Sequence, residues 1–330
     1  MIIILVPARF GVASVGRMVL DLLAIDTETT GVAWDDEAFM ISVATPHKTY
    51  VFDKRELHDA EWFDIISDVT IDLGKADRII MHNAKFDMQK LMRLGIPYHV
   101  FVDKFEDTQA MAHLIDEHQP TGLKYLASSY LGLSTDEDEV LKVWRRKNKM
   151  KKEDGYYPIP NEILAPYAAK DAEFTLQLYT DFTKRLHNDL LPLYEIEKRL
   201  TLSLLRIEAQ GMQVDREYVT RKRKEYGDRI YKLKSRIGEL AGKEFNPQSH
   251  QQVLAALQER GFVVSSTSKD ALSQVDDELA GLIVELREAN KIKSTYFDAL
   301  DTEAKNSILH PNFRQHGTRT GRMSSGAAEA

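Results

Sequence analysis

The sequence predicts an α/β domain followed by a mostly α-helical region. Short apolar runs of strand length alternate with helix-compatible segments over the first 190 residues. From residue 193 onward, helical spacing replaces this alternation. No internal repeat or low-complexity tract interrupts the pattern, so we expect two domains in the 330 residues.

The expected elements follow one another in a regular order. The expected strands are 19–25, 40–44, 49–52 and 78–81, and the expected helices are 61–73, 86–94, 107–115, 123–131 and 161–190. Asn83 is the expected N-cap of the second helix, and Pro166 should kink the last helix or begin its main part. Periodicity is absent over 136–152, where an acidic run and a basic stretch predict a charged loop.

Composition narrows the function classes. A content of 43% hydrophobic and 29% charged residues is typical of a globular protein. The net charge of −7 argues against a protein that coats nucleic acid by bulk attraction. There is no cysteine, so disulfides and thiolate sites are excluded and we expect any metal to have oxygen ligands. Pro7 and Arg9 interrupt the apolar start of the chain, which excludes a membrane span there and predicts a cytoplasmic protein.

Four acidic residues in three motifs are the candidate catalytic and metal-binding residues. Asp26 and Glu28 follow the first strand, and residues two apart on a strand point to the same face. Two carboxylates held that close favour a shared divalent cation, because without one their repulsion would force a proton onto one of them. Asp87 lies in the first turn of a helix, and Asp171 lies on a later helix. Hydrolysis of a phosphodiester by paired divalent cations needs about this number of carboxylates.

Polar neighbours accompany two of these acids. His82 and Asn83 stand at the exit of the strand before Asp87, where α/β sites assemble, and are candidate substrate contacts. Tyr167 shares a helix face with Asp171, so its phenol could orient a water. Each motif also has an ordinary structural explanation: a solvated strand end, a helix-stabilising acid or an amphipathic helix pair. Their joint occurrence, in one order on strand, strand–helix and helix, favours a nuclease.

Together, these motifs resemble the Exo I, Exo II and Exo III motifs of the DEDD 3′→5′ exonucleases, over roughly residues 19–190. The resemblance implies a ribonuclease H-like fold, in which helices flank a mixed sheet. Tyr167 stands four residues before Asp171 and marks the tyrosine subclass, since the histidine subclass has its histidine where this chain has Pro166. Segments 107–108 and 123–127 also look like family core segments, and we interpret them as helix packing.

The resemblance also implies roles for the candidate residues. Asp26, Glu28 and Asp171 are expected to hold the metal that activates water. Asp26 would bridge to a second metal near Asp87, and Tyr167 would position the nucleophilic water. The expected cofactors are two divalent cations, Mg²⁺ or Mn²⁺, because hard oxygen ligands suit them.

Segments 245–249, 266–270, 291–296 and 318–325 follow one another in the second half, and together they resemble successive segments of the thumb of the family A DNA polymerases and of its entry into the palm. A helix expected over 216–240 carries nine Lys and Arg residues against four acidic ones, as a surface that grips duplex phosphates requires. The chain then reaches a run rich in Gly, Arg and hydroxyl residues, which suits close approach to a DNA backbone. Candidate DNA contacts are Lys222, Arg223, Arg319, Thr320 and Arg322. A charged solvated helix and a flexible tail are the structural alternatives.

These resemblances divide the chain into four parts: an N-terminal extension (1–18), an exonuclease domain (19–190), a thumb-like helical region (191–305) and the start of a palm (306–330). The family's polymerising aspartates belong beyond the last residue, so we expect a truncated polymerase that does not extend a primer. The expected function is proofreading in bacterial or phage replication, with a single-stranded 3′ end at the nuclease site, duplex DNA at the thumb and a polymerase portion or replication proteins as partners. The alternatives are a stand-alone ribonuclease D-like RNA exonuclease and a non-catalytic DNA-binding module.

Overall fold

The computed structural model describes residues 2–5, 21–151, 154–242 and 245–326. The chain divides into two compact units, the first comprising Met1–Gln210 and Pro311–Ala330 and the second comprising Gly211–His310. Residues 6–20, which include most of the predicted extension and the start of the first predicted strand, lie outside the described residues.

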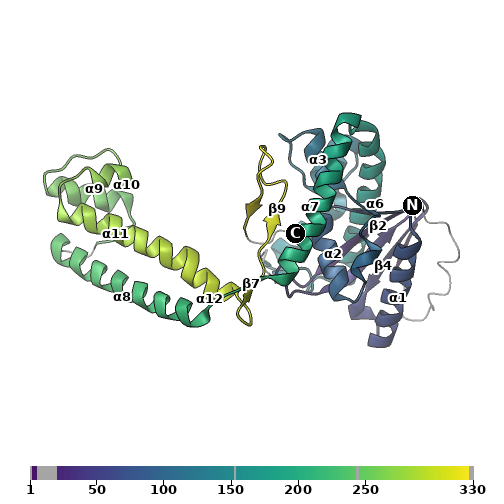
Figure 1. Ribbon diagram of the computed structural model, residues 1–330, viewed down its shortest axis with the longest axis horizontal. Helices are drawn as coiled ribbons and strands as arrows, with labels where there is room; N and C mark the ends of the chain where they lie inside the picture. The colour runs from purple at the N-terminus through teal and green to yellow at the C-terminus, as the bar shows by residue number, and fades with distance from the viewer. Residues whose placement is uncertain (1, 6–20, 152–153, 243–244, 327–330) are drawn as a thin grey trace. The chain divides into compact units, whose positions relative to one another are not determined.

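A mixed sheet forms the centre of the first unit (Figure 1). Its described strands are β1 (Ile2–Leu5), β2 (Leu22–Thr29), β3 (Ala38–Ala44), β4 (Lys48–Asp53), β5 (Arg78–Met81) and β6 (Phe105–Asp107). They lie in the order β1–β4–β3–β2–β5–β6. The β2–β3 and β3–β4 pairs are antiparallel and the other three are parallel. The predicted α/β class is confirmed, and β6 is a strand that the prediction missed.

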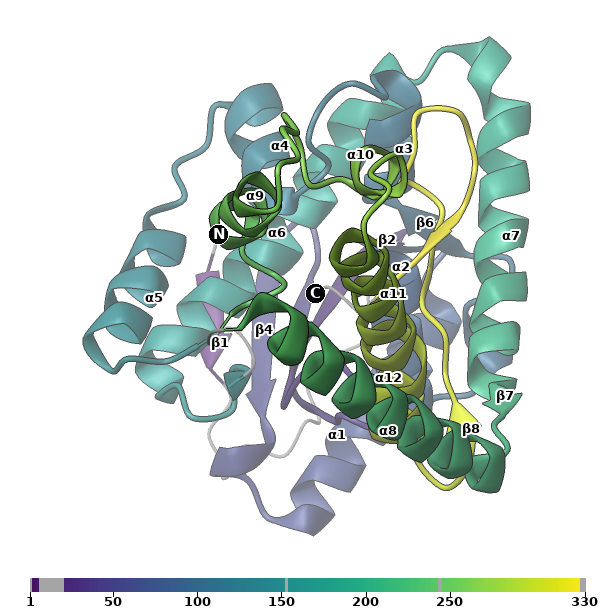
Figure 2. The same cartoon turned by 90° about the vertical axis from the view of Figure 1, so that its left-hand side faces the viewer.

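Helices cover both faces of this sheet (Figures 1 and 2). They are α1 (Asp59–Lys75), α2 (Ala84–Arg93), α3 (Thr108–Ile115), α4 (Leu123–Leu131), α5 (Asp136–Lys147), α6 (Asn161–Arg185) and α7 (Leu191–Gln210). Alternate residues of β2 point to opposite faces of the sheet. Leu23 and Ile25 pack with α1 and α2, while Ala24 packs with Ala172 of α6. Helix α6 therefore lies on the face opposite α1 and α2.

Part of the predicted loop over 136–152 is a helix, α5. Leu141 is buried, and Trp144 packs against the apolar cluster that includes Leu164 of α6. Lys142 pairs with Asp138 one turn earlier at 2.6 Å. Acidic residues fill the first turn and basic residues the last, an arrangement that the helix dipole favours. The charge segregation that suggested a loop is therefore a feature of a helix.

The second unit is a small helical assembly. Its helices are α8 (Arg216–Ala241), α9 (His250–Glu259), α10 (Lys269–Ser273), α11 (Glu278–Ile292) and α12 (Ala299–Glu303), with a π-helical segment, η5 (Lys293–Asp298), between the last two. Helices α8 and α11 lie side by side, with Ile230 and Ile237 packed against Ile283 (Figure 1). Strand β7 (Met212–Gln213) pairs antiparallel with β8 (Ile308–Leu309). The predicted helix over 216–240 is confirmed.

After the second unit the chain returns to the first. Strand β9 (Phe313–Arg314) pairs with β10 (Ser324–Ser325). Glu208 of α7 accepts a hydrogen bond from the Phe313 backbone N–H at 2.7 Å, and Lys85 of α2 contacts both Glu208 and the Phe313 carbonyl. These bonds hold the returning segment on α2 and α7.

None of the helices that the structure describes combines the length and the apolar character that a membrane span requires.

Candidate active site

Strand β2 carries the first two candidate carboxylates. It continues through Asp26 and Glu28, which lie opposite Ser42 and Met40 of β3, so the strand end predicted at residue 25 is wrong. Pairing with β3 extends β2 beyond its apolar run, and the register shifts only after Glu28. Both acids alternate with Thr27 and share the face of Ala24, the face that α6 covers.

Helix α6 brings the third carboxylate to the same place. Ala165, Ala168 and Ala169 are fully buried, and such small side chains let the helix backbone approach the sheet closely. Asp171 follows on the same helix. One carboxylate oxygen from each of Asp26, Glu28 and Asp171 lies within 4.8 Å of the other two. Three acids from two distant segments therefore meet at one point.

Asp87 approaches from the other side of the sheet. Its Oδ1 accepts hydrogen bonds from the backbone N–H and the hydroxyl of Thr27, at 3.1 and 2.7 Å. Thr27 is on the face of β2 that α2 covers, which explains why Asp87 lies next to Asp26 and Glu28 but outside their 4.8 Å cluster. Burial raises the pKa of Asp87, and the negative charge of Asp26 raises it further. The two carboxyls are therefore close enough to interact.

Burial makes these carboxyls hard to ionise. It raises the pKa of Asp26 to about 7, against the opposing charge of Lys124. Burial first and the charge of Asp26 second raise the pKa of Glu28 well above its ordinary value. A nearby cation would reverse both shifts, because opposite charge favours the ionised form. Convergent carboxylate oxygens are also the ligands that Mg²⁺ and Mn²⁺ prefer, so the residues present fit a divalent cation.

Lys124 is a site residue that sequence reasoning missed. It is the second residue of α4, and its Nζ forms an ion pair with Oδ1 of Asp171. The interpretation of residues 123–127 as helix packing holds for Leu126 and Ala127, which are fully buried. It is wrong for Lys124, whose charge acts on Asp26 as well. Burial lowers the pKa of Lys124 to about 8, although the neighbouring carboxylates oppose that shift.

The Tyr167 side chain lies one helical turn before Asp171. Its ring stacks on Tyr156, with centroids 6.0 Å apart and planes 22° apart. Burial raises the pKa of Tyr167 well above its ordinary value, and the charges of Tyr156 and Glu28 add to the shift. The phenol therefore keeps its proton and offers a neutral hydroxyl beside the carboxylates.

The turn between β5 and α2 depends on Asp107. Asn83 is the N-cap residue of α2, as predicted, but it has φ 65° and its side chain makes no capping hydrogen bond. The Asp107 carboxylate instead accepts hydrogen bonds from the backbone N–H groups of Asn83 and Ala84, at 3.1 and 3.0 Å. His82 Nδ1 and the Thr108 hydroxyl lie 2.8 Å apart in a further hydrogen bond. Asp107 and Thr108, expected only to pack, thus hold the two candidate substrate contacts.

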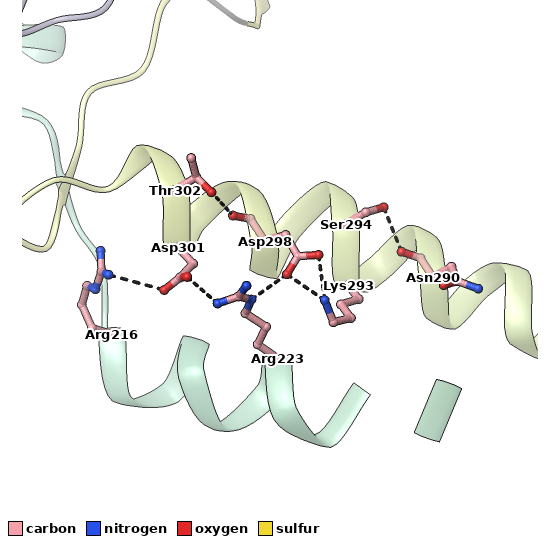
Figure 3. Close-up of polar contacts among 8 residues, drawn as sticks. All are labelled: Arg216, Arg223, Asn290, Lys293, Ser294, Asp298, Asp301 and Thr302. Carbon is pink, nitrogen blue, oxygen red and sulfur yellow. Dashed lines mark hydrogen bonds and ion pairs between the residues drawn. The ribbon is translucent and has the colours of Figure 1, made fainter. Parts of the chain in front are cut away.

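The other candidate DNA contacts lie in different parts of the chain. Arg223 of α8 pairs with Asp298 at 2.6 Å and with Asp301 (Figure 3). Lys222 pairs with Glu225 at 2.8 Å. Both charges are thus balanced by acids of the second unit. The remaining candidates are exposed residues of the returning segment: Arg319, Thr320 and Arg322.

Known proteins share both parts of this sequence. Residues 12–187 match the family described as 3′-5′ exonuclease, and residues 216–328 match DNA polymerase family A. The chain is 28% identical to a DNA polymerase DpoZ of Vibrio phage phiVC8, over 92% of this chain and 54% of the relative. It is 32% identical to DNA polymerase I of Chloroflexus aurantiacus, over 74% of this chain and 27% of the relative. The chain thus spans about half the length of the phage relative and about a quarter of the bacterial one.

A solved structure shares the fold. It is the POL domain of Pol1 from M. smegmatis in complex with DNA primer-template and dNTP, with a TM-score of 0.70 and 20% identity. The alignment covers 92% of this chain and 51% of that one. The exonuclease match covers more than half of the residues and is followed by the polymerase match. The chain therefore belongs to the DNA polymerase I-like family A polymerases that carry a 3′–5′ exonuclease domain.

Proposed function

We propose that this chain is a metal-dependent proofreading exonuclease that hydrolyses the 3′-terminal phosphodiester of DNA. The observation that carries the proposal is the convergence of Asp26, Glu28 and Asp171 within 4.8 Å. Asp87, held beside them by Thr27, completes the expected set of four carboxyls. The relatives are named as DNA polymerases, which supports DNA as the substrate class.

The four carboxyls would hold two divalent cations, Mg²⁺ or Mn²⁺. Asp26, Glu28 and Asp171 would bind one ion, and Asp26 with Asp87 would bind the other. When bound, such ions supply Lewis-acid stabilisation of the attacking and leaving oxygens of a phosphodiester. The protein contributes position, since β2, α2 and α6 fix the four side chains before any ligand arrives.

Tyr167 would position the attacking water. Its hydroxyl is protonated at neutral pH, and burial raises its pKa further, so it can donate to a water oxygen and accept from a water hydrogen. The stack on Tyr156 limits the freedom of the ring. His82 and Asn83, held by Thr108 and Asp107, would contact the terminal nucleotide from the α2 side.

The second unit and the returning segment would bind duplex DNA as a polymerase thumb and the start of a palm. The polymerase match over 216–328 supports this role, and we keep the division at residues 19–190, 191–305 and 306–330 as part of the proposal. The proposed contacts are Lys222, Arg223, Arg319, Thr320 and Arg322. We place the protein in the bacterial or phage-infected cytoplasm, with a polymerase portion or replication proteins as partners.

Labelled oligonucleotides test the nuclease proposal. The chain and an Asp26→Ala/Glu28→Ala variant are incubated with 3′- and 5′-labelled single strands of DNA and RNA, with Mg²⁺ or with EDTA. We expect mononucleotide release from the 3′ end of DNA that requires Mg²⁺ and is lost in the variant. A strong preference for RNA would instead favour a ribonuclease D-like enzyme. The absence of Mg²⁺-dependent release would favour a non-catalytic module, and an undiminished variant would overturn the site assignment.

A further inference from the structure

One cation of the chain already lies among the candidate metal ligands. The Lys124 ammonium is ion-paired with Oδ1 of Asp171, which belongs to the 4.8 Å carboxylate cluster. The two side chains are 20% and 10% exposed. Because water reaches them poorly, dissolved salt screens their attraction much less than it screens a surface pair.

Two aromatic rings also contact this ammonium. Lys124 Nζ lies 4.0 Å from the ring centroid of Tyr167 and 5.3 Å from that of Phe174. Both distances fall inside the range of about 6 Å in which an aromatic face attracts a cation. An ammonium that leaves Asp171 therefore still has a favourable position close by.

The backbone of Lys124 is held in place by packing, while its side chain can move. Leu126 and Ala127 of α4 are fully buried, and Leu126 belongs to an apolar cluster that includes Phe182 of α6. Helix α4 is thus anchored against α6. The ammonium stands on a flexible four-carbon stem, so its displacement requires no movement of the helix.

A divalent cation and this ammonium would require the same carboxylate, that of Asp171. Positive charges a few ångströms apart repel strongly where water is scarce, so binding of one weakens binding of the other. We propose that Lys124 is a built-in competitor of the metal, which pairs with the carboxylate cluster in the metal-free protein and, when a divalent cation binds, leaves Asp171 while it keeps its contact with the Tyr167 ring. This inference rests on the proposed function, because it requires Asp26, Glu28 and Asp171 to be metal ligands.

A purely structural ion pair between α4 and α6 makes a different prediction. Loss of a structural pair would destabilise the protein equally with and without metal, and would leave metal affinity unchanged or weaker. Loss of a competitor would instead strengthen metal binding. The two roles are therefore separated by measuring metal affinity, without reference to catalysis.

Calorimetric titration of the full chain with Mn²⁺ tests the inference. Lys124→Met removes the charge and keeps an unbranched side chain, and Lys124→Arg keeps the charge. Lys198→Met is the matched control, because Lys198 pairs with the buried Glu106 at 3.1 Å outside the cluster. We expect Lys124→Met to bind Mn²⁺ about tenfold more tightly, within the usual range of coupling between sites. Lys124→Arg and Lys198→Met should bind as the unsubstituted chain does.

Unchanged or weaker Mn²⁺ binding by folded Lys124→Met would overturn the inference. The Asp26→Ala/Glu28→Ala variant separates this failure from failure of the proposed function. If that variant loses Mn²⁺ binding while Lys124→Met is unchanged, only the role of Lys124 fails. If it binds Mn²⁺ as tightly as the unsubstituted chain, the metal site itself is wrong and the inference falls with it.

A second measurement needs no folded Lys124→Met protein. Lysine labelled with ¹³C at Cε is incorporated into the unsubstituted chain, and the Lys124 resonance is assigned from its loss in Lys124→Arg. We expect this resonance to shift on addition of Mg²⁺, because the ammonium loses its carboxylate partner while it keeps the aromatic rings. The Lys198 resonance should stay in place. A Lys124 resonance that is unmoved at saturating Mg²⁺ would contradict the displacement.

Discussion

Thr27 joins Asp87 to the strand that carries Asp26 and Glu28. Its backbone N–H and its hydroxyl both donate to the same Asp87 oxygen, at 3.1 and 2.7 Å. Thr27 stands between the other two acids in sequence but faces the opposite side of the sheet. A single residue therefore sets the position of a carboxyl from α2 relative to the pair on β2.

Thr27→Val should uncouple Asp87 from this strand. Valine keeps the β-branched shape but loses the hydroxyl donor, so one of the two hydrogen bonds to Asp87 disappears. We expect the free energy of unfolding to fall by about 1 kcal/mol and the nuclease rate to fall roughly tenfold through misplacement of the carboxyl. Thr27→Ser, which restores the donor, should recover most of the rate. Full activity in Thr27→Val would show that this bond does not position Asp87.

The buried carboxyls should make the metal-free protein less stable as pH rises. Burial raises the pKa of Asp26 from 3.8 to about 7, so the folded state keeps a proton that the unfolded state releases. The resulting stabilisation is complete below about pH 4 and is lost as pH increases through about 7. The raised pKa values of Glu28 and Asp87 act in the same direction.

Urea unfolding in EDTA, followed across this pH range, measures the loss. Saturating Mg²⁺ should reduce or reverse it, because the ion binds the ionised carboxyls and so stabilises the folded state most at high pH. The Asp26→Asn/Glu28→Gln variant should show a weaker pH dependence in EDTA. Burial lowers the pKa of His82 and of His316 to about 4, and these groups act in the opposite direction. The test is therefore the difference between the two chains, and an identical pH dependence in the unsubstituted chain and the variant would contradict the assigned direction.

Tyr167→Phe should lower the catalytic rate with little effect on substrate affinity. The substitution keeps the stack on Tyr156 and the contact with Lys124, and removes only the hydroxyl. A misplaced nucleophile costs on the order of 100-fold, so we expect kcat to fall by about 10- to 100-fold at an unchanged KM. Tyr130→Phe is the control, because Tyr130 donates to Gln119 at 2.9 Å away from the carboxylates. Equal losses in the two variants would argue for a general effect on packing.

Duplex binding by the second unit should weaken with salt. Arg223 is engaged with Asp298 and Asp301, whereas Lys224 and Lys234 are exposed on α8 and form no ion pair with any residue that the structure describes. Log affinity falls with log salt in proportion to the phosphates neutralised. Lys224→Ala/Lys234→Ala should therefore reduce the slope by about two. Arg223→Ala should change it less, and a slope unchanged in the lysine variant would exclude those residues as phosphate contacts.

Local periodicity predicted much of the first unit. Strand 78–81 and helix 123–131 have the predicted bounds, because apolar spacing and turn residues define them locally. The extent of β2 depends on a distant partner, since pairing with β3 carries the strand through Asp26 and Glu28. Helix α5 was missed because its anchor, Leu141, is a single buried residue in a run of charges. Tertiary pairing and burial decide such segments, and neither is a local pattern.

In the candidate site, too, local patterns predicted some residues, whereas tertiary contacts determine the others. The meeting of Asp26, Glu28 and Asp171 follows the pattern of the three motifs, whose residue types and spacing are visible in the chain. The roles of Lys124 and Asp107 depend on tertiary contacts. Lys124 of α4 meets Asp171 of α6, and Asp107 of β6 meets the backbone at the start of α2. A lysine in an amphipathic helix and an aspartate before one are common, so neither stood out.

The pairing of β7 with β8 would let related chains exchange the second unit as a whole. It places the start and the finish of the second unit side by side, with Gln210 before it and Pro311 after it. A module whose ends are adjacent can be exchanged by recombination as a cassette. All four carboxyls precede Gln210, and the joint of Lys85, Glu208 and Phe313 secures the chain on its return. Helical modules of different length or charge can thus be grafted at this point while the acidic centre is inherited intact.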